Sequence, residues 1–194
     1  MGLIKIKKGL NVPINGEPEQ VIEEGVSPKT AALVGFDYAG MKPTLEVAVG
    51  DTVKRGQILF TDKKMAGVNY TSPAGGTVTA INRGEKRVFQ SLVIEIAENE
   101  EEESFESYPE IELIGLDIEK IKKNLVESGL WTAFRARPFG KVANPASTPN
   151  SIFVTAMDTN PLAPSVEKIL EGKENEFKNG LTIISRLTEG TVYL

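Results

Sequence analysis

The sequence has 194 residues, of which 40% are hydrophobic and 25% are charged, a composition that is ordinary for a globular protein with one or two small domains. It contains no cysteine and no histidine, which excludes iron–sulfur clusters, thiolate zinc sites, disulfides, cysteine nucleophiles and Ser-His-Asp triads. We therefore predict no catalytic residue and no metal site. No run approaches the ~20 apolar residues that span a bilayer, and the N-terminus lacks the apolar core of a secretory signal. We expect a cytoplasmic protein that contacts a membrane only through a partner.

The net charge of −5 is concentrated in one stretch of the chain. Residues 97–110 contain seven glutamates, and the remainder of the sequence has 20 acidic residues against 22 basic ones. A run of this kind is usually a solvated linker between domains, and an acidic docking surface is the alternative. No basic stripe of the kind that nucleic-acid-binding proteins carry is present.

The first half of the chain predicts an arm followed by a small β domain. Residues 1–29 mix short apolar pieces with Asn, Pro and Gly, and they predict an extended arm in which Ile4, Ile6 and Leu10 could form an edge strand. Residues 30–96 predict an all-β sandwich or barrel, because short apolar runs alternate with glycine turns at close spacing. The expected strands lie at 45–49, 58–60, 77–81 and 92–96, and a Gly50-Asp51 turn follows the first.

The second half predicts helices and buried strands. Asp117 is a good N-cap for a helix with Ile118 and Ile121 on its apolar face, and Gly129 suits the C-terminal cap. A buried strand is expected at 152–156, followed by a short helix that begins with Asn160 as its cap and Pro161 at its first position, a second helix around 177–187 and a strand at 191–194. One strand–helix–strand unit cannot cover both faces of its sheet. We therefore expect either a longer functional subunit or a partner that completes the sheet.

Two neighbouring segments of the β domain form a specific pattern. Residues 49–59 (VGDTVKRGQIL) are followed by Asp62-Lys63-Lys64 and then by residues 72–78 (SPAGGTV). This order resembles the biotinyl/lipoyl carrier fold, in which glycines allow tight reversals and small residues let two sheets approach closely. The resemblance places Asp62 and Lys63 at the carrier hairpin, where the lysine of true carriers is acylated. The connection to Pro73 is longer than in such carriers, so we expect a reshaped hairpin tip and an unmodified Lys63.

A longer pattern runs through essentially the whole chain. Its four segments are residues 32–43 (ALVGFDYAGMKP), 81–87 (INRGEKR), 128–139 (SGLWTAFRARPF) and 153–162 (FVTAMDTNPL). Together they resemble the A subunit of the sodium-translocating NADH:quinone reductase. They are also similar to the C subunit of Rnf-type electron-transport complexes, and the last two segments favour the reductase over the Rnf-type relative.

Taken with the residue patterns, the resemblance predicts an α+β fold. Its expected parts are an N-terminal arm at 1–29, a biotinyl/lipoyl-like β barrel-sandwich hybrid domain at 30–96, an acidic linker at 97–110, and an incomplete Rossmann-like α/β domain at 111–194.

The resemblance further implies a peripheral, cofactor-free protein at the cytoplasmic face of the bacterial inner membrane, assembled with the other subunits of its complex. That complex passes electrons from NADH to ubiquinone and exports sodium, and the flavins and the iron–sulfur centre are expected in partner subunits. Three alternatives stay open: a component of an Rnf-type complex, a covalent carrier that uses Lys63, and a pure assembly scaffold.

Quinone binding is a further implication of the resemblance. A quinone head needs a flat apolar slot and one or two donors to its carbonyl oxygens. We expect two aromatic segments to meet and supply these groups, and the candidates are Phe36, Tyr38, Trp131, Phe134, Arg135, Arg137 and Phe139. The alternative is that Trp131 and Phe134 are core anchors and that the arginines pair with acids.

Two other motifs carry less information about function. Asp158-Thr159-Asn160 follows the carboxyl end of a predicted strand, where open α/β sheets usually bind ligands, but helix capping explains Asn160 equally well. The Gly75-Gly76 pair lacks the strand-to-helix context of a phosphate-binding loop, so we interpret it as a packing feature.

Overall fold

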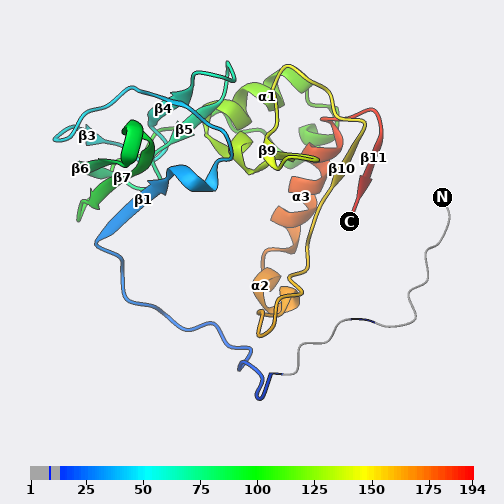
Figure 1. Cartoon of the computed structure of the whole chain (residues 1–194). Coiled ribbons are helices and arrows are strands. Elements are labelled where there is room, and N and C mark those ends of the chain that lie inside the picture. The colour runs from blue at the N-terminus through cyan, green and yellow to red at the C-terminus, as the bar shows by residue number, and fades with distance from the viewer. Residues whose placement is uncertain (1–8, 10–13) are drawn as a thin grey trace.

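The computed structural model describes residue 9 and residues 14–194 (Figure 1). The edge strand predicted from Ile4, Ile6 and Leu10 lies outside the described residues. Residues 14–29 have no helix or strand, and they run away from the β domain toward helix α2 (Val166–Leu170). There the side chain of Gln20 accepts a hydrogen bond of 2.7 Å from the backbone N–H of Ser165.

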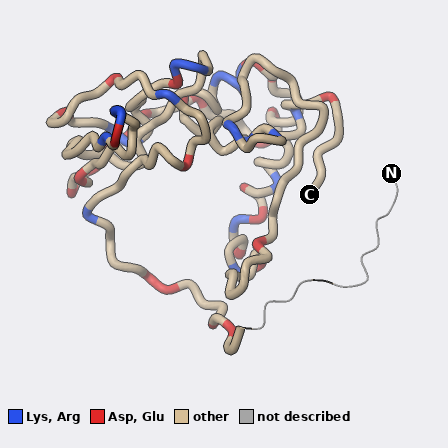
Figure 2. The backbone as a smooth tube through the Cα atoms, in the orientation of Figure 1, with Lys and Arg blue, Asp and Glu red and all other residues tan. Residues whose placement is uncertain are grey.

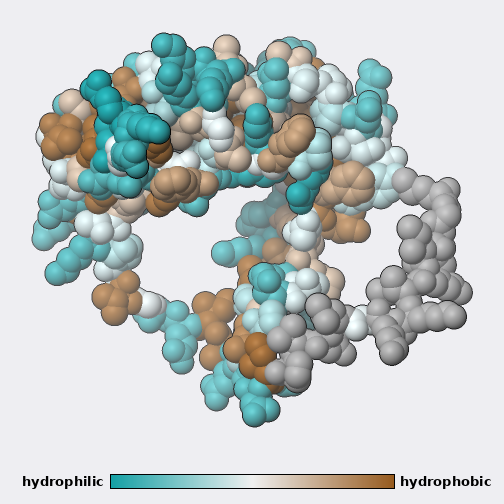
Figure 3. Space-filling view, viewed as in Figure 1, coloured by the Kyte–Doolittle hydropathy of each residue, from teal (hydrophilic) through white to brown (hydrophobic). Residues whose placement is uncertain are grey.

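Exposed apolar side chains gather where this arm passes α2 (Figure 3). The exposed large apolar residues of residues 20–29 and 160–170 are Val21, Ile22, Val26, Leu162 and Ile169.

Residues 30–96 form two antiparallel sheets within the described part of the chain. The first has the strand order β1-β7-β6-β3 and the second the order β2-β4-β5. The strands are β1 (Thr30–Val34), β2 (Pro43–Leu45), β3 (Thr52–Val53), β4 (Ile58–Asp62), β5 (Asn69–Thr71), β6 (Gly76–Arg83) and β7 (Phe89–Ile96). The two sheets pack their apolar faces together, because the largest fully buried side chains come from both: Leu59, Phe60 and Tyr70 from the second, Val53, Val78, Leu92 and Ile94 from the first.

The expected strands at 58–60, 77–81 and 92–96 are confirmed as parts of longer strands, whereas the strand predicted at 45–49 is wrong. Strand β2 ends at Leu45, and the chain then crosses to the other sheet, where the Gly50 N–H donates to the Val78 carbonyl at 2.8 Å. Val47 still packs against the core, while Val49 is exposed. The alternation therefore marks a half-buried connection rather than a strand.

The Gly75-Gly76 pair is a packing feature, as the sequence predicted. A Cβ atom at Gly76 would lie 1.9 Å from the Glu95 carbonyl oxygen, so a side chain cannot fit where β6 runs beside β7. Gly76 begins a strand and is not followed by a helix.

The acidic stretch 97–110 is largely exposed, yet it contacts the elements on either side of it. The Glu100 carboxylate accepts hydrogen bonds from the Gly75 N–H at 2.7 Å and from the Arg55 guanidinium at 2.8 Å. The Glu106 carboxylate accepts one from the Lys123 ammonium at 3.1 Å. The stretch is thus held along the edge of the β domain. Its role as a domain boundary stays a prediction, as do the other boundaries at 1–29, 30–96 and 111–194.

Beyond this stretch the chain forms helices, 3-10 turns and short strands. They are η3 (Glu110–Gly115), α1 (Ile118–Glu127), η4 (Leu130–Ala133), β8 (Arg135–Ala136), β9 (Lys141–Val142), β10 (Ser151–Phe153), α2, α3 (Glu174–Ser185) and β11 (Thr191–Tyr193). Helix α1 has the predicted caps: the Asp117 carboxylate accepts from the Glu119 N–H at 2.7 Å, and Gly129 has a φ of +79°.

Strands β10 and β11 form a parallel pair connected through α2 and α3, which is the predicted strand–helix–strand unit. Strand β10 covers only Ser151–Phe153, and the Phe153 side chain is 72% exposed, so the prediction of a buried strand at 152–156 is wrong in length and burial. Phe153 instead stacks on Tyr193 of the neighbouring strand, with ring centroids 4.8 Å apart.

The helix predicted to begin after Asn160 begins only at Val166. The Asp158 carboxylate accepts a hydrogen bond of 2.9 Å from the Asn160 N–H and closes a local turn that competes with helix formation. Pro164 follows and disfavours a helical conformation of the residue before it, so the helix starts beyond this proline.

Helix α1 and turn η4 pack directly on the β domain (Figure 1). The Thr71 hydroxyl of β5 donates to the Ser128 carbonyl at the end of α1 at 3.0 Å. One core cluster contains buried residues of the β domain together with Leu116, Ile121, Trp131, Val142 and Leu187. This packing holds the irregular segment 131–139 beside the loop that follows β1.

Candidate functional site

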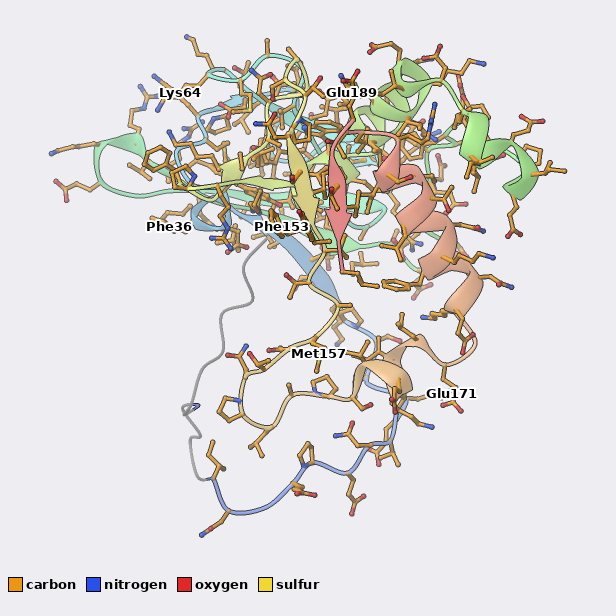
Figure 4. The ribbon with its side chains drawn as sticks, turned by 90° about the vertical axis from the view of Figure 1, so that its right-hand side faces the viewer. Phe36, Lys64, Phe153, Met157, Glu171 and Glu189 are labelled. Carbon is orange, nitrogen blue, oxygen red and sulfur yellow. The ribbon has the colours of Figure 1, made fainter. Side chains whose placement is uncertain are left out.

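A pocket of about 470 Å³ lies at the surface beside the loop that follows β1. Turn η1 (Gly35–Asp37), residues 38–43 and the β6–β7 loop line it, together with Lys64 from the β4–β5 hairpin. Figure 4 shows Phe36 and Lys64 on the same side of the molecule, away from Met157 and Glu171. The apolar part of the lining is Phe36, Tyr38, Met41, Pro43, Val88 and Phe89, and the basic part is Lys42, Lys64, Arg83, Lys86 and Arg87.

Tyr38 connects this pocket to the segment 131–139. The Arg135 guanidinium lies over the Tyr38 ring, 5.4 Å from its centroid, and it donates to the Asp37 carbonyl at 3.3 Å. The same guanidinium donates to the Thr132 carbonyl at 2.7 Å. The two aromatic segments that were expected to meet therefore do so at Arg135 and Tyr38.

Trp131 and Phe134 lie in the core on the inner side of this contact. Trp131 is buried, and its indole N–H donates to the Ala143 carbonyl at 2.8 Å. Phe134 packs edge-on against it, with ring centroids 5.2 Å apart. Trp131 is buried and Phe134 partly buried against the core, and both position the backbone from which Arg135 extends. Their contact with a quinone stays a prediction.

Arg137 and Phe139 lie in the β8–β9 turn and do not line the pocket. Both side chains are exposed, Phe139 to 78%. The structure therefore places Phe36 and Tyr38 in one pocket lining and Arg135 against Tyr38, while Arg137 and Phe139 lie in the exposed β8–β9 turn. The alternative that the arginines pair with acids does not describe Arg135, whose hydrogen bonds go to backbone carbonyls.

A second tyrosine lies behind the pocket. The Tyr70 ring contacts the Tyr38 ring edge-on, with centroids 4.7 Å apart, and its hydroxyl is buried without a hydrogen-bond partner in the part of the chain that the structure describes. Burial, followed by the nearby Asp62 and Tyr38, raises the pKa of Tyr70 far above its ordinary value. Burial also raises the pKa of Tyr38, against the opposing effect of Arg135. Both phenols therefore remain protonated at neutral pH, and the half-buried Tyr38 is the one that can donate to a ligand in the pocket.

The carrier-like residues lie on the β4–β5 hairpin. The buried Asp62 carboxylate accepts hydrogen bonds from the backbone N–H groups of Lys42 at 3.1 Å and Lys64 at 2.9 Å, and so ties the hairpin to the loop after β1. Lys63 follows directly, and its side chain is exposed. Asp62 is thus a structural residue, whereas Lys63 is free to contact other molecules.

Neither a metal cluster nor a membrane helix is found in the described residues. Residue 9 and residues 14–194 contain no group of three or more metal-ligating side chains that could hold an ion. No helix in these ranges has the length and hydropathy needed to cross a membrane.

Two family models match this chain in succession. The NqrA N-terminal barrel-sandwich hybrid domain matches residues 4–97, and the NqrA second alpha/beta domain matches residues 116–194. The chain belongs to the NqrA family. The expected barrel-sandwich hybrid domain and the α/β domain after it are thereby confirmed.

Curated NqrA relatives are named as the A subunit of Na(+)-translocating NADH-quinone reductase. The relative from Marinomonas sp. is 59% identical over 192 residues, that from Saccharophagus degradans 56%, and that from Alcanivorax borkumensis 55%. Each match covers 99% of this chain and 43% of the relative, so the chain spans less than half the length of these NqrA proteins.

Sequence reasoning missed the basic wall of the pocket in this NqrA chain. Its residues come from three segments that are far apart along the chain, so no single motif contains them. The sequence does show Arg83, Lys86 and Arg87 close together within residues 81–87. That segment was used only as part of the family pattern, and its positive charge was not interpreted.

Proposed function

We propose that this chain acts within the A subunit of a sodium-translocating NADH:quinone reductase, which passes electrons from NADH to ubiquinone and exports sodium. The support is its 59% identity to a relative of that name over 99% of the chain. In this proposal the protein is peripheral and lies at the cytoplasmic face of the membrane. It carries no cofactor of its own, and the flavins and the iron–sulfur centre belong to partner subunits.

Within that complex, we propose that the chain contributes to the binding of the quinone head. The observation that carries this role is the contact of Arg135 with Tyr38 at the edge of the pocket. Phe36, which is 74% exposed, offers an aromatic face, while Arg135 and the protonated Tyr38 are donors for quinone carbonyl oxygens.

The remaining candidates have different parts in this proposal. Trp131 and Phe134 hold the backbone of Arg135, whereas Arg137 and Phe139 flank the site without lining the pocket.

Photolabelling of the intact complex with a quinone that carries a photoreactive head tests this role. We expect labelled peptides that contain residues 36–38 or 131–139, and a several-fold loss of labelling in the Arg135→Ala variant. Arg137→Ala is the matched control, because Arg137 is an exposed arginine of the same segment, whereas Arg135 is the one that lies over the Tyr38 ring and donates to the Asp37 carbonyl. Background labelling of both segments, or equal losses in the two variants, would contradict the proposal.

A covalent carrier is a second candidate function, and the exposed side chain of Lys63 on the hairpin favours it. The intact mass of the protein, purified from its native membrane complex, tests the carrier function. A biotin- or lipoate-sized increment on Lys63 would establish the carrier, and an unmodified mass would remove it.

A further inference from the structure

The basic wall of the pocket has no part in the proposed quinone contacts. It consists of Lys42, Lys64, Arg83, Lys86 and Arg87. In the described residues none of these side chains has a carboxylate within ion-pair distance, although ion pairs occur elsewhere on the surface. The chain as a whole carries a net charge of −5, whereas this pocket wall concentrates unpaired positive charge. Figure 2 shows basic residues of the β6–β7 loop at the surface of the β domain.

The nearby acids do not neutralise this wall. Asp62 lies behind it, but its carboxylate is occupied by the backbone N–H groups of Lys42 and Lys64. Asp37 and Glu85 lie on the lining loops, and neither forms an ion pair within the described part of the chain. The Lys64 ammonium donates to the Gly40 carbonyl at 3.3 Å and the Arg83 guanidinium to the Arg87 carbonyl at 3.4 Å, but neither bond neutralises charge. The positive charge of the wall is therefore left for a ligand to neutralise.

The backbone of the β6–β7 loop is strained at two of these residues. Lys86 has a φ of 55° and Arg87 a φ of 63°, a left-handed region that residues other than Gly, Asn and Asp rarely adopt. The loop contains a glycine, Gly84, but its φ is −92°, which any residue can adopt. The two left-handed positions are thus occupied by Lys86 and Arg87 and not by the glycine. Strain of this kind is typical of residues that are retained for a function.

The turn itself does not need these side chains. It is closed by backbone hydrogen bonds from the Arg87 N–H to the Gly84 carbonyl at 3.0 Å and from the Val88 N–H to the Glu85 carbonyl at 3.2 Å. Glycine at positions 86 and 87 would keep both bonds and relieve the strain.

We propose that this pocket binds a phosphate group. Guanidinium groups present paired donors that match phosphate oxygens, and lysines add point charges, so Arg83, Arg87 and Lys86 form a suitable set. The volume of about 470 Å³ leaves room for the body of the molecule that carries the phosphate. That carrier is either an anionic phospholipid headgroup or a soluble phosphate such as a nucleotide.

Two binding assays on the full-length protein distinguish the two sources. Calorimetry with ATP and with inorganic phosphate measures soluble ligands. Co-sedimentation with vesicles of phosphatidylglycerol and phosphatidylcholine, compared with phosphatidylcholine alone, measures headgroup binding. Binding in the first assay assigns the pocket to a soluble phosphate, and binding to the anionic vesicles alone assigns it to a lipid. Binding in neither assay would overturn the proposal.

Two double variants locate the binding. Lys86→Gln with Arg87→Gln removes the charges and should weaken binding by about tenfold or more. Lys173→Gln with Lys178→Gln removes the same charge from exposed positions near and on α3 and should leave binding unchanged. If the two variants weaken binding equally, the interaction depends only on the net charge of the protein, and the proposed site is refuted.

The glycine variant separates binding from folding. Lys86→Gly with Arg87→Gly should also lose binding while the protein becomes more resistant to denaturant, because the strained backbone is relieved. A loss of both stability and binding would show that the two side chains serve the fold. The Arg135→Ala variant keeps Lys86 and Arg87 and should retain phosphate binding while it loses quinone labelling, so this proposal and the quinone proposal can fail separately.

Discussion

Replacement of Tyr70 by Phe should stabilise this protein. The Tyr70 side chain is 2% exposed, stacks on Phe60 with ring centroids 4.7 Å apart, and buries a hydroxyl that has no partner among the described residues. A buried polar group without a hydrogen bond costs about 1–3 kcal/mol. Phe keeps the ring contacts and removes only the hydroxyl, so we expect the free energy of unfolding to rise by about 1 kcal/mol or more.

Denaturant titration measures this change, with the fluorescence of Trp131 as the signal. Trp131 is the single tryptophan of the chain and is buried where η4 packs on the β domain. The midpoint of the Tyr70→Phe variant should shift to higher denaturant without a change in slope. Tyr108→Phe is the control, because the Tyr108 hydroxyl donates to Glu106 and its removal should bring no gain. A lower midpoint for Tyr70→Phe would show that its hydroxyl is bonded in solution and would refute the reasoning.

Three further predictions concern the core and the acidic stretch. Trp131→Ala should lower the free energy of unfolding by about 3–5 kcal/mol, measured by circular dichroism during thermal unfolding, and a loss below about 1 kcal/mol would contradict its role as a core anchor. Gly76→Ala should destabilise the β domain by about 1–3 kcal/mol or more in the same assay, because its Cβ would meet the Glu95 carbonyl; an unchanged melting temperature would contradict this. The Gly75 N–H and then Arg55 hold the pKa of Glu100 below 4.5, so its stabilising effect is present above that pH and is lost as the pH falls through the depressed pKa. Glu100→Gln should flatten the acid limb of the stability profile, and an identical profile would contradict this.

Local patterns predicted those elements whose residues interact with near neighbours in the sequence. The Asp117 and Gly129 caps fix both ends of α1 through contacts within one turn, so the helix lies where it was expected. The same local logic failed at Asn160, because the Asp158 carboxylate and Pro164 favour a turn over the helix. Residues 45–49 alternate like a strand, but hydrogen bonding to the other sheet ends the strand at Leu45.

The sequence predicted only part of the candidate site. The order of motifs identified the family, and aromatic composition selected Phe36, Tyr38 and Arg135 as candidates that the structure does bring together. Composition could not separate these from Trp131, whose role depends on burial against the β domain.

By itself, the sequence determined the family, the glycine-dependent β architecture and the absence of cysteine and histidine chemistry, because each of these rests on residue identity and short-range order. Tertiary structure alone decided which arginine faces Tyr38, which tyrosine hydroxyl is buried, and that five cations surround one pocket among the described residues. These features are set by contacts between residues far apart in the chain. Such contacts form only when the two sheets and α1 pack together, so no local pattern encodes them.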